Sequence, residues 1–490
     1  MKLSFIGADH EVADSCHCLE ACGKNIRIAY GMEPGVNDFL NAAPPFSAAA
    51  TDYVFITHAH IDHTGLLPLL YRDGFRGRLY ATAATTELCG IMLRDCAHIQ
   101  EADAEWLNRK RKRAGGEETE PLYTMQDAEG VLQLFTPCHY GERVHVAEGI
   151  DIRFIDAGHL LGSASIEVFL KEDGVEKKLV FSGDIGNLNQ PLIKNPTYPT
   201  TADYVIMEST YGHRSHGPKP DYERSLAGII AETLSRGGNV VIPCFAVGRT
   251  QEVLYFLRKI RADGMVPGFE KVDVWLDSPL AIEATRIFDE QTRECFDDET
   301  LALMDKGVNP IQFPGLKYSI TAEDSKRINE DPSPKVILSA SGMCDAGRIR
   351  HHLKHNLWRS DSTVVFAGYQ AVGTLGRSLL AGAKNVKLSG EDLHVAARIC
   401  RIDGISGHAD REGLLRWISA FTEKPRKVFV VHGEDLTSDL FASTLRNRLS
   451  LDAEAPYSGS VFDLAKGAWV TRAGPRAVHK LEDPARRAGA

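Results

Sequence analysis

One short stretch, His58-Ala-His60-Ile-Asp62-His63, constrains this chain more than any other part of its sequence. It places three imidazoles and one carboxylate within six residues, directly after the apolar run at 53–56. Such a run is typical of a buried strand that delivers side chains into a loop, and alternation puts His58 and His60 on the same side. Neutral imidazole and carboxylate are suitable ligands for a borderline divalent metal such as zinc. Because the ligands form two groups offset along the loop, the stretch favours two metals over one.

The size and composition of the chain predict a cytoplasmic protein of two or three domains. Its 490 residues exceed the usual size of one domain. No segment approaches the roughly 20 consecutive apolar residues that cross a bilayer, so we expect no membrane contact. Residues 1–7 are typical of a first strand and not of a signal peptide. The ten cysteines include no C-x-x-C pair and are typical of reduced thiols.

The net charge of −10 argues against a broad nucleic-acid-binding surface, although it leaves a local one open. Residues 109–113, Arg-Lys-Arg-Lys-Arg, form the one strong basic run. Cations favour a helix C-terminus and Gly115-Gly116 follow, so a solvated helix end is one interpretation. Contact with a polyanion is the other, and the sequence favours neither.

Changes in the pattern of strands and helices predict a large insertion. Residues 1–208 alternate short apolar strands with glycine turns, whereas 209–394 alternate strands with longer helices, as in a parallel, doubly wound sheet. The first pattern returns at 395–470, and 471–490 lack any period and are predicted to be a flexible tail. We therefore expect a first domain in two parts, separated by a second domain.

Further ligand-type residues stand at the ends of other predicted strands, beside small residues that allow the backbone to approach a metal closely. They are His159, Asp184, Glu208, His408 and His432. Each is a weak signal alone, because glycine-flanked polar residues are common in turns. Their repetition in a chain that contains the stretch 58–63 predicts one shared metal site.

Three other polar motifs receive structural interpretations. Cys16-His17-Cys18 is typical of a strand with inward cysteines and an outward histidine. The three histidines within 351–355 have helical spacing but no carboxylate partner, which predicts a helix surface or RNA contacts rather than another metal site. Asp410 is predicted to cap a loop.

Taken together, the motifs resemble those of the β-CASP family, nucleases with a metallo-β-lactamase fold. The stretch 58–63 corresponds to the fold's second motif, His159 to the third and Asp184 to the fourth. The three β-CASP motifs correspond to Glu208, His408 and His432. The resemblance covers nearly the whole chain. It implies an α/β fold in which an αββα metallo-β-lactamase sandwich carries an inserted parallel α/β domain, the β-CASP domain.

The resemblance also implies a centre with two Zn²⁺ ions, for which Mn²⁺ is an alternative. One ion would be bound by His58, His60 and His159, and the other by Asp62, His63 and His432. Asp184 would bridge both ions opposite a bridging hydroxide that attacks the phosphodiester. His408 would protonate the leaving oxygen as a general acid, and Glu208 would orient its imidazole.

Glycine-rich turns of the inserted domain provide candidate contacts with substrate phosphates. Ser341, Gly342 and Arg377 are the predicted contacts, and tight-turn geometry alone is the alternative explanation. The family's first motif has an aspartate that supports the ligand loop, whereas this chain has Ala29 there. The replacement bears on the rigidity and metal affinity of the loop but not on the ligand set.

The implied activity is zinc-dependent hydrolysis of phosphodiester bonds in single-stranded RNA, in an endonuclease mode, a 5′-exonuclease mode or both. His432 favours RNA, because DNA-acting relatives have valine at that motif. The alternatives are a DNA nuclease of the same fold, a catalytically inactive RNA-binding scaffold, and a small-molecule hydrolase. A homodimer is also left open.

Overall fold

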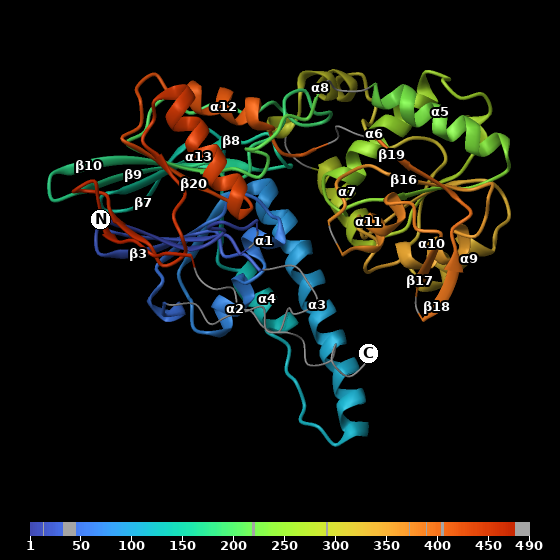
Figure 1. Ribbon diagram of the computed structural model, residues 1–490, viewed down its shortest axis with the longest axis horizontal. Helices are drawn as coiled ribbons and strands as arrows, with labels where there is room; N and C mark the ends of the chain where they lie inside the picture. Colours follow the sequence, from blue (N-terminus) through green and yellow to red (C-terminus); the bar gives the residue numbers. More distant parts are fainter. Residues whose placement is uncertain are drawn as a thin grey trace.

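The chain consists of two bodies that lie side by side in a computed structural model (Figure 1). The structure describes residues 1–12, 14–32, 46–217, 221–290, 293–371, 373–388, 390–402 and 406–475. Two stacked sheets with helices outside them form the first body, and a third sheet with its own helices forms the second. Most of the predicted tail, from residue 476 onward, lies outside the described residues.

The first sheet has eight strands in the order β23-β22-β1-β2-β3-β4-β5-β6. Its strands are β1 (Lys2–Gly7), β2 (Cys16–Ala21), β3 (Lys24–Ile28), β4 (Tyr53–Phe55), β5 (Arg78–Thr82), β6 (Phe135–Cys138), β22 (Val461–Asp463) and β23 (Ala468–Thr471). β1 pairs antiparallel with both β2 and β22, so segments from both ends of the chain meet in this sheet. From β3 to β6 the pairing is parallel, which brings the carboxyl ends of these strands to one edge.

The second sheet has seven strands in the order β21-β20-β11-β10-β9-β8-β7. Its strands are β7 (Arg143–Ala147), β8 (Ile150–Asp156), β9 (Ala164–Glu172), β10 (Val175–Phe181), β11 (Tyr204–Glu208), β20 (Lys427–Val431) and β21 (Ala453–Glu454). β10, β11 and β20 run parallel to one another. Three segments that are distant in the sequence therefore end side by side.

Aromatic side chains fill the space between these two sheets. Phe5 and Phe55 from the first sheet meet Phe154, Phe181 and Phe429 from the second, and each is at most 2% exposed. Fully burying a side chain of this size stabilises a fold by about 1.5–3 kcal/mol relative to leaving it in water. The two sheets are thus held face to face, and loops at their shared edge are brought together.

Helices cover the outer faces of the stacked sheets (Figure 1). They are α1 (Ile61–Thr64), α2 (Leu67–Arg72), α3 (Ala83–Ala114), α4 (Met125–Leu132), α12 (Arg411–Ser419) and α13 (Asp435–Leu449), with a short 3₁₀ turn, η2 (Ala48–Ala50). The first four lie on the side of the first sheet, and α12 and α13 pack on the second. This arrangement is the predicted αββα sandwich. No helix within the described ranges combines the length and apolar character needed to span a bilayer.

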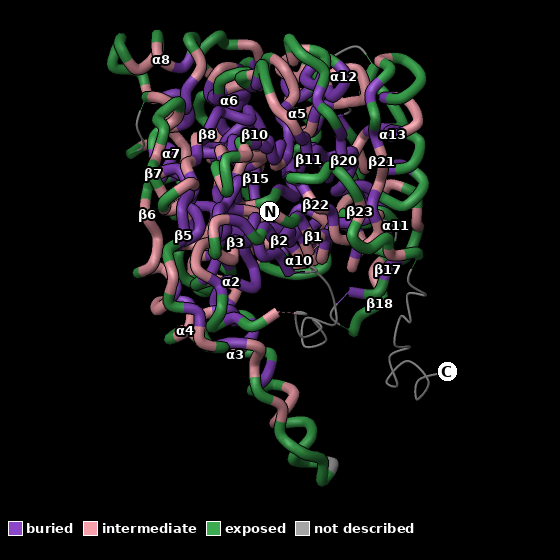
Figure 2. Tube along the Cα trace, turned by 90° about the vertical axis from the view of Figure 1, so that its left-hand side faces the viewer, coloured by how far each residue is buried: buried purple, intermediate pink, exposed green. Residues whose placement is uncertain are grey.

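The outer half of α3 extends away from both bodies and is largely exposed (Figure 2). The basic run 109–113 lies in its last turns. Gly115 adopts φ +71°, and the N–H groups of Gly115 and Gly116 donate to the carbonyls of Lys112 and Arg111. A left-handed glycine that satisfies the final carbonyls is a common helix end. The interpretation of the run as a helix end is confirmed.

The third sheet is fully parallel, with the order β14-β13-β15-β12-β16-β19. Its strands are β12 (Val240–Pro243), β13 (Val274–Leu276), β14 (Leu316–Tyr318), β15 (Val336–Ser339), β16 (Thr363–Phe366) and β19 (Arg398–Arg401). Its other elements are α5 (Tyr222–Ser235), α6 (Arg249–Ala262), η3 (Phe269–Lys271), α7 (Pro279–Glu290), η4 (Arg293–Cys295), α8 (Asp298–Asp305), α9 (Ala322–Glu330), α10 (Ile349–Asn356), α11 (Leu375–Leu380) and the hairpin of β17 (Asn385–Leu388) and β18 (Glu391–His394). β19 pairs with β16, so this sheet extends past the predicted division at 394 as far as Arg401.

Two of the structural interpretations from the sequence are wrong for one histidine each. His17 is 6% exposed and lies between the stacked sheets, because its ring contacts Phe5 and Phe181 instead of facing outward. His352 is fully buried, and its Nε2 atom lies 2.6 Å from the carboxylate of Asp277, which follows β13. His351 and His355 are exposed on α10, as predicted, but His352 has a buried partner 75 residues away in the sequence.

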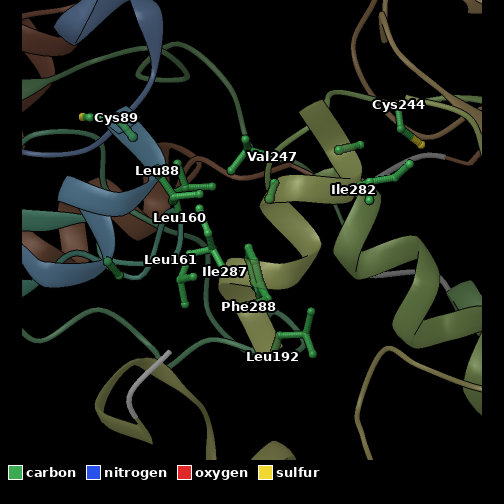
Figure 3. Packing of buried hydrophobic residues seen from close by; sticks show 14 of the residues in the cluster. Leu88, Cys89, Leu160, Leu161, Leu192, Cys244, Val247, Ile282, Ile287 and Phe288 are labelled. Carbon is green, nitrogen blue, oxygen red and sulfur yellow. The ribbon is translucent and has the colours of Figure 1, made fainter. Parts of the chain in front are cut away.

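Apolar contacts join the two bodies into one continuous core (Figure 3). Leu88 of α3 and Leu160 of the first body lie in the same buried cluster as Val247 and Ile287 of the second. Figure 3 shows Val247, Leu160 and Ile287 facing one another across the boundary. The loop after β12 is therefore held against the segment that follows β8.

Candidate metal centre

Seven side chains from four segments of the chain meet at one edge of the stacked sheets. His58 and His60 follow β4, and Asp62 and His63 lie in α1, which begins directly afterwards. The remaining three follow the ends of β8, β10 and β20, and they are His159, Asp184 and His432. The structure thus brings together all seven predicted ligands.

The close approach of these loops depends on glycine. Gly183 adopts φ +57° between Ser182 and Asp184. A Cβ atom at this position would lie 2.8 Å from the Cβ of Thr57, the residue before His58. Only glycine combines this backbone conformation with so little space, because it has no side chain to place there. The end of β10 can therefore lie directly against the histidine-rich loop.

The seven side chains form two groups. The first group contains His58, His60, His159 and Asp184, and one polar atom of each lies within 4.8 Å of one polar atom of every other. Nδ1 of His60 lies 3.0 Å from Nε2 of His58 and 3.4 Å from Nε2 of His159. Oδ2 of Asp184 lies 3.4 Å from Nε2 of His58 and 3.5 Å from Nε2 of His159. A tetrahedral zinc ion with bonds of about 2.1 Å separates its ligand atoms by about 3.4 Å. The spacing of this group fits such an ion.

The second group contains Asp62, His63 and His432, again with ligand atoms within 4.8 Å of one another. Oδ2 of Asp62 lies 4.0 Å from Nε2 of His63 and 3.5 Å from Nε2 of His432. The other oxygen of Asp184, Oδ1, lies 3.4 Å from Nε2 of His63 and 3.6 Å from Nδ1 of His432. Each carboxylate oxygen of Asp184 therefore faces a different group.

The chemistry of the donor set also fits a metal. Asp184 Oδ1 and His432 Nε2 are buried and have no hydrogen-bond partner. A buried polar atom without a partner is costly, so such atoms in a native structure require a ligand, an ion or water. Burial lowers the pKa of His58 and His159 well below the ordinary value, despite the opposing charge of Asp184. Both imidazoles are therefore neutral, which is the form that binds a metal.

Polar groups behind three of the histidines orient their rings. Oγ1 of Thr57 lies 3.2 Å from Nδ1 of His58, and Oγ1 of Thr210 lies 3.1 Å from Nδ1 of His432. Nδ1 of His159 lies 3.0 Å from the carbonyl oxygen of Gly407. Contacts of this kind fix the tautomer and orientation of a ligating histidine. These orienting residues are not among the predicted site residues, although Thr57 precedes His58 and Thr210 lies two residues after Glu208.

His408 and Glu208 form a pair beside the shared aspartate. The backbone of His408 bridges to Gly186, just beyond Asp184, and its Nδ1 lies 3.9 Å from Oδ2 of Asp184. The same nitrogen lies 3.4 Å from the carboxylate of Glu208, which is 1% exposed and also accepts the N–H of Ile185. Burial alone lowers the pKa of His408, but the charge and hydrogen bond of Glu208 and the charge of Asp184 raise it above its ordinary value.

Ala29 occupies a buried position behind the centre. It has φ +61° and is 3% exposed. Together with Ser15, His17 and His63 it lines a cavity of about 30 Å³ that also reaches Asp184 and His432. A cavity of this size holds one or two water molecules. Where the family has a carboxylate, this chain leaves space that water can fill.

The predicted substrate contacts lie at the carboxyl edge of the third sheet. Ser341 and Gly342 follow β15, and the hydroxyl of Ser341 lies 3.3 Å from the carbonyl oxygen of Ala346 within the same turn. Arg377 is exposed in α11. Asp410 caps α12 through the N–H of Gly413, so its interpretation as a capping residue is confirmed.

Known proteins share this architecture. The Beta-Casp domain family matches residues 250–379, and the Zn-dependent metallo-hydrolase RNA specificity domain matches residues 392–456. Ribonuclease TTHA0252 of Thermus thermophilus is 37% identical over 89% of this chain and 94% of its own length. Transcription termination factor FttA of Methanosarcina mazei is 31% identical over 93% of this chain and 70% of its own length. A solved structure of a protein of unknown function from Enterococcus faecalis, 12% identical, has the same fold, with a TM-score of 0.52 over 94% of this chain and 99% of that one.

The stacked sheets and the histidine–carboxylate groups at their edge define a metallo-hydrolase. The similarity to the Thermus thermophilus protein over most of both chains shows that this chain belongs to the β-CASP family of metallo-β-lactamase-fold ribonucleases. The predicted family, fold class and enzyme class are confirmed, and zinc and RNA are supported at the level of the family.

Metal uptake at the second group is expected to release a proton. Burial lowers the pKa of His432, but the charges of Asp184 and Asp62 raise it to about 10. Since a ligating imidazole must be neutral, binding between pH 7 and 9 releases about one proton, and the affinity rises about tenfold per pH unit. Titration calorimetry of the metal-free protein in buffers with different ionisation enthalpies measures this release. His432→Gln should remove it, and heats that do not depend on the buffer in the wild-type protein would contradict the expectation.

Proposed function

We propose that this protein hydrolyses phosphodiester bonds in single-stranded RNA at a centre of two zinc ions. The observation that carries the proposal is the position of Asp184, whose two oxygens face two separate groups of ligands while His408 stands 3.9 Å away. His58, His60 and His159 would hold one ion, and Asp62, His63 and His432 the other. The same seven ligands are compatible with Mn²⁺.

Two divalent cations held this way lower the pKa of a water molecule and offset the charge of the phosphate. Residues of the chain supply the proton donor and hold it in position. His408, charged because Glu208 and Asp184 raise its pKa, donates a proton to the leaving oxygen. Glu208 holds the imidazole of His408 through contacts of 3.4 Å and is itself fixed by the N–H of Ile185. A general acid next to Asp184 is suited to protonate the leaving oxygen of an in-line displacement.

We infer that the two bodies have different roles. Residues 1–208 and 395–470 would form the domain that carries the metals, with β19 assigned by its pairing to the other body. Residues 209–394 would form the inserted domain that lies against it and restricts access to an unpaired strand. Ser341, Gly342 and Arg377 remain candidate contacts with phosphates, and a cytoplasmic location and a homodimer remain predictions.

Cleavage assays on matched nucleic acids test the substrate class. The zinc-loaded protein should cleave a labelled single-stranded RNA and leave the same sequence as single-stranded DNA, and the RNA duplex, largely intact. Labels at the 5′ end and the 3′ end, used separately, distinguish internal cuts from stepwise removal of 5′ nucleotides. Cleavage of the DNA with intact RNA would make the protein a DNA nuclease of the same fold. Two bound metals without cleavage of either strand would favour the scaffold.

The pH dependence of the reaction tests the pairing of His408 with Glu208. Activity requires protonated His408, so it should fall as the pH rises through a pKa that lies above the ordinary value for histidine. Glu208→Gln removes the charge that raises this pKa, so the descending limb of the kcat/KM profile should move to lower pH. Glu423→Gln, on an exposed loop, is the control that should leave the limb in place. An unchanged limb in Glu208→Gln would mean that another group donates the proton.

A further inference from the structure

The third sheet has a topological switch point at the carboxyl ends of β12 and β15. The chain leaves β12 through α6 toward β13 on one side, and leaves the adjacent β15 through α10 toward β16 on the other. The two helices lie on opposite faces, because α6 shares a core with Ile242 and α10 shares a different core with Val241. Ligands of open α/β sheets bind outside the carboxyl ends of strands at such points.

Two aromatic rings are exposed at this edge of the sheet. Phe245 follows β12 and is 48% exposed, and Tyr369 follows β16, the other neighbour of β12, and is 49% exposed. Single exposed apolar side chains are common on protein surfaces and need no special explanation. Two aromatic rings on adjacent strand ends, at the switch point, are a more specific arrangement.

The loop after β12 borders the segment that carries His159. In the loop after β12, a Cβ atom on Gly248 would lie 3.0 Å from Cδ1 of Leu160, the neighbour of His159. The loop after β16 is tied to the loop after β12, because Nε2 of Gln370 donates to the carbonyl of Gly342, which lies against Phe245. An RNA strand bound at the metal centre would therefore pass close to Phe245 and Tyr369.

Buried contacts hold the ring of Phe245 and the backbone of both loops in place. A Cβ atom on Gly342 would lie 3.0 Å from both the ring and the backbone nitrogen of Phe245, so these residues are already in close contact. Thr250 donates its hydroxyl to the carbonyl of Phe245 at 2.7 Å. Gln370, 3% exposed, donates from Nε2 to the carbonyls of Gly342 and Tyr369 at 2.9 and 3.0 Å. The loops after β12, β15 and β16 are thus tied together, which preorganises the rings.

We propose that Phe245 and Tyr369 form a stacking surface on which the unpaired bases of the RNA lie as the strand reaches the metal centre. This inference rests on the proposed function. It adds that the protein recognises the bases of the RNA as well as its phosphates. Stacking on aromatic rings accepts every base and requires that the bases be unpaired. The surface thus accounts for a preference for single strands without a preference for sequence, and it does so with two uncharged residues in a chain of net charge −10.

Binding to RNA with and without bases tests this surface. The zinc-loaded protein in a His408→Ala background, which slows cleavage and is expected to keep its metals, binds a fluorescent single-stranded RNA and the same strand with abasic positions. Phe245→Leu with Tyr369→Leu should weaken binding to the normal strand by about tenfold or more. The same double variant should bind the abasic strand as the parent does. A general loss of structure would weaken binding to both strands equally.

Matched variants complete the test. Trp358→Leu removes a ring that is 59% exposed, but it lies before β16 at the opposite edge of the sheet and should change neither affinity. Tyr369→Phe should retain stacking, and Gly342→Ala should weaken binding of the normal strand by displacing Phe245. If the active protein cleaves RNA but the double leucine variant binds both strands like its parent, the stacking surface is wrong and the proposed function stands. If the wild-type protein does not cleave RNA, the proposed function fails first.

Discussion

Asp184→Ala should lower kcat/KM on single-stranded RNA by about 10³-fold or more, because several kcal/mol of charge stabilisation by the metals is lost and each 1.4 kcal/mol is a factor of about ten. The reason is geometric. The two oxygens of Asp184 approach His58 and His63 equally closely, at 3.4 Å, so its removal opens both groups at once. Initial rates on a labelled strand, with metal content measured on the same samples, provide the test.

The matched control for this variant is Asp103→Ala, which removes an exposed carboxylate from α3, distant from the ligand loops in the sequence. It should keep both the wild-type rate and the wild-type metal content. Retention of substantial activity in Asp184→Ala, together with two bound metals, would show that another group joins the two sites. The ligand assignment would then need to be redrawn.

His408→Ala should lower the rate by about 10²–10⁴-fold, the range expected for loss of a general acid. Metal content should not change, because His408 is outside the two ligand groups, although it lies 3.9 Å from Asp184 and its ring contacts that of His159. The loss should be much smaller on an RNA analogue whose leaving group is a weak base, since such a group departs without a proton. Rates of wild type and variant on both substrates measure this difference.

A uniform loss on both substrates would contradict the assignment of His408 as the proton donor and would favour a role in shaping the site. The contact between the rings of His408 and His159, with centroids 4.5 Å apart, makes that alternative concrete. Loss of metal from His408→Ala would also favour a role of His408 in shaping the site. A variant with full metal content and a deficit confined to the natural leaving group supports the assignment.

The convergence of the seven side chains could be predicted because each stands at the end of a strand or directly after one, where local sequence is informative. The apolar run 53–56 and its histidine-rich continuation occupy consecutive residues, and parallel pairing of β10, β11 and β20 explains why Asp184, Glu208 and His432 meet. Parallel strands end at the same edge of a sheet, so a periodic pattern followed by one polar residue is a positional signal.

Contacts between distant segments could not be predicted in this way. His159 is oriented by a carbonyl 248 residues later, and His17 is buried because an aromatic ring of another sheet covers it. A carbonyl oxygen carries no signal in the sequence, and a strand residue shows its alternation but not which face another sheet will cover. The pairing of β19 with β16 was missed for a similar reason, since a four-residue strand looks the same in either domain.

Counting the zinc ions bound to the intact protein by native mass spectrometry tests the central claim most directly. The geometry of the seven side chains predicts two ions per chain in the wild-type protein at neutral pH, and fewer than two in both Asp184→Ala and His63→Ala. A wild-type chain that retains one ion or none under saturating zinc would contradict the paired centre.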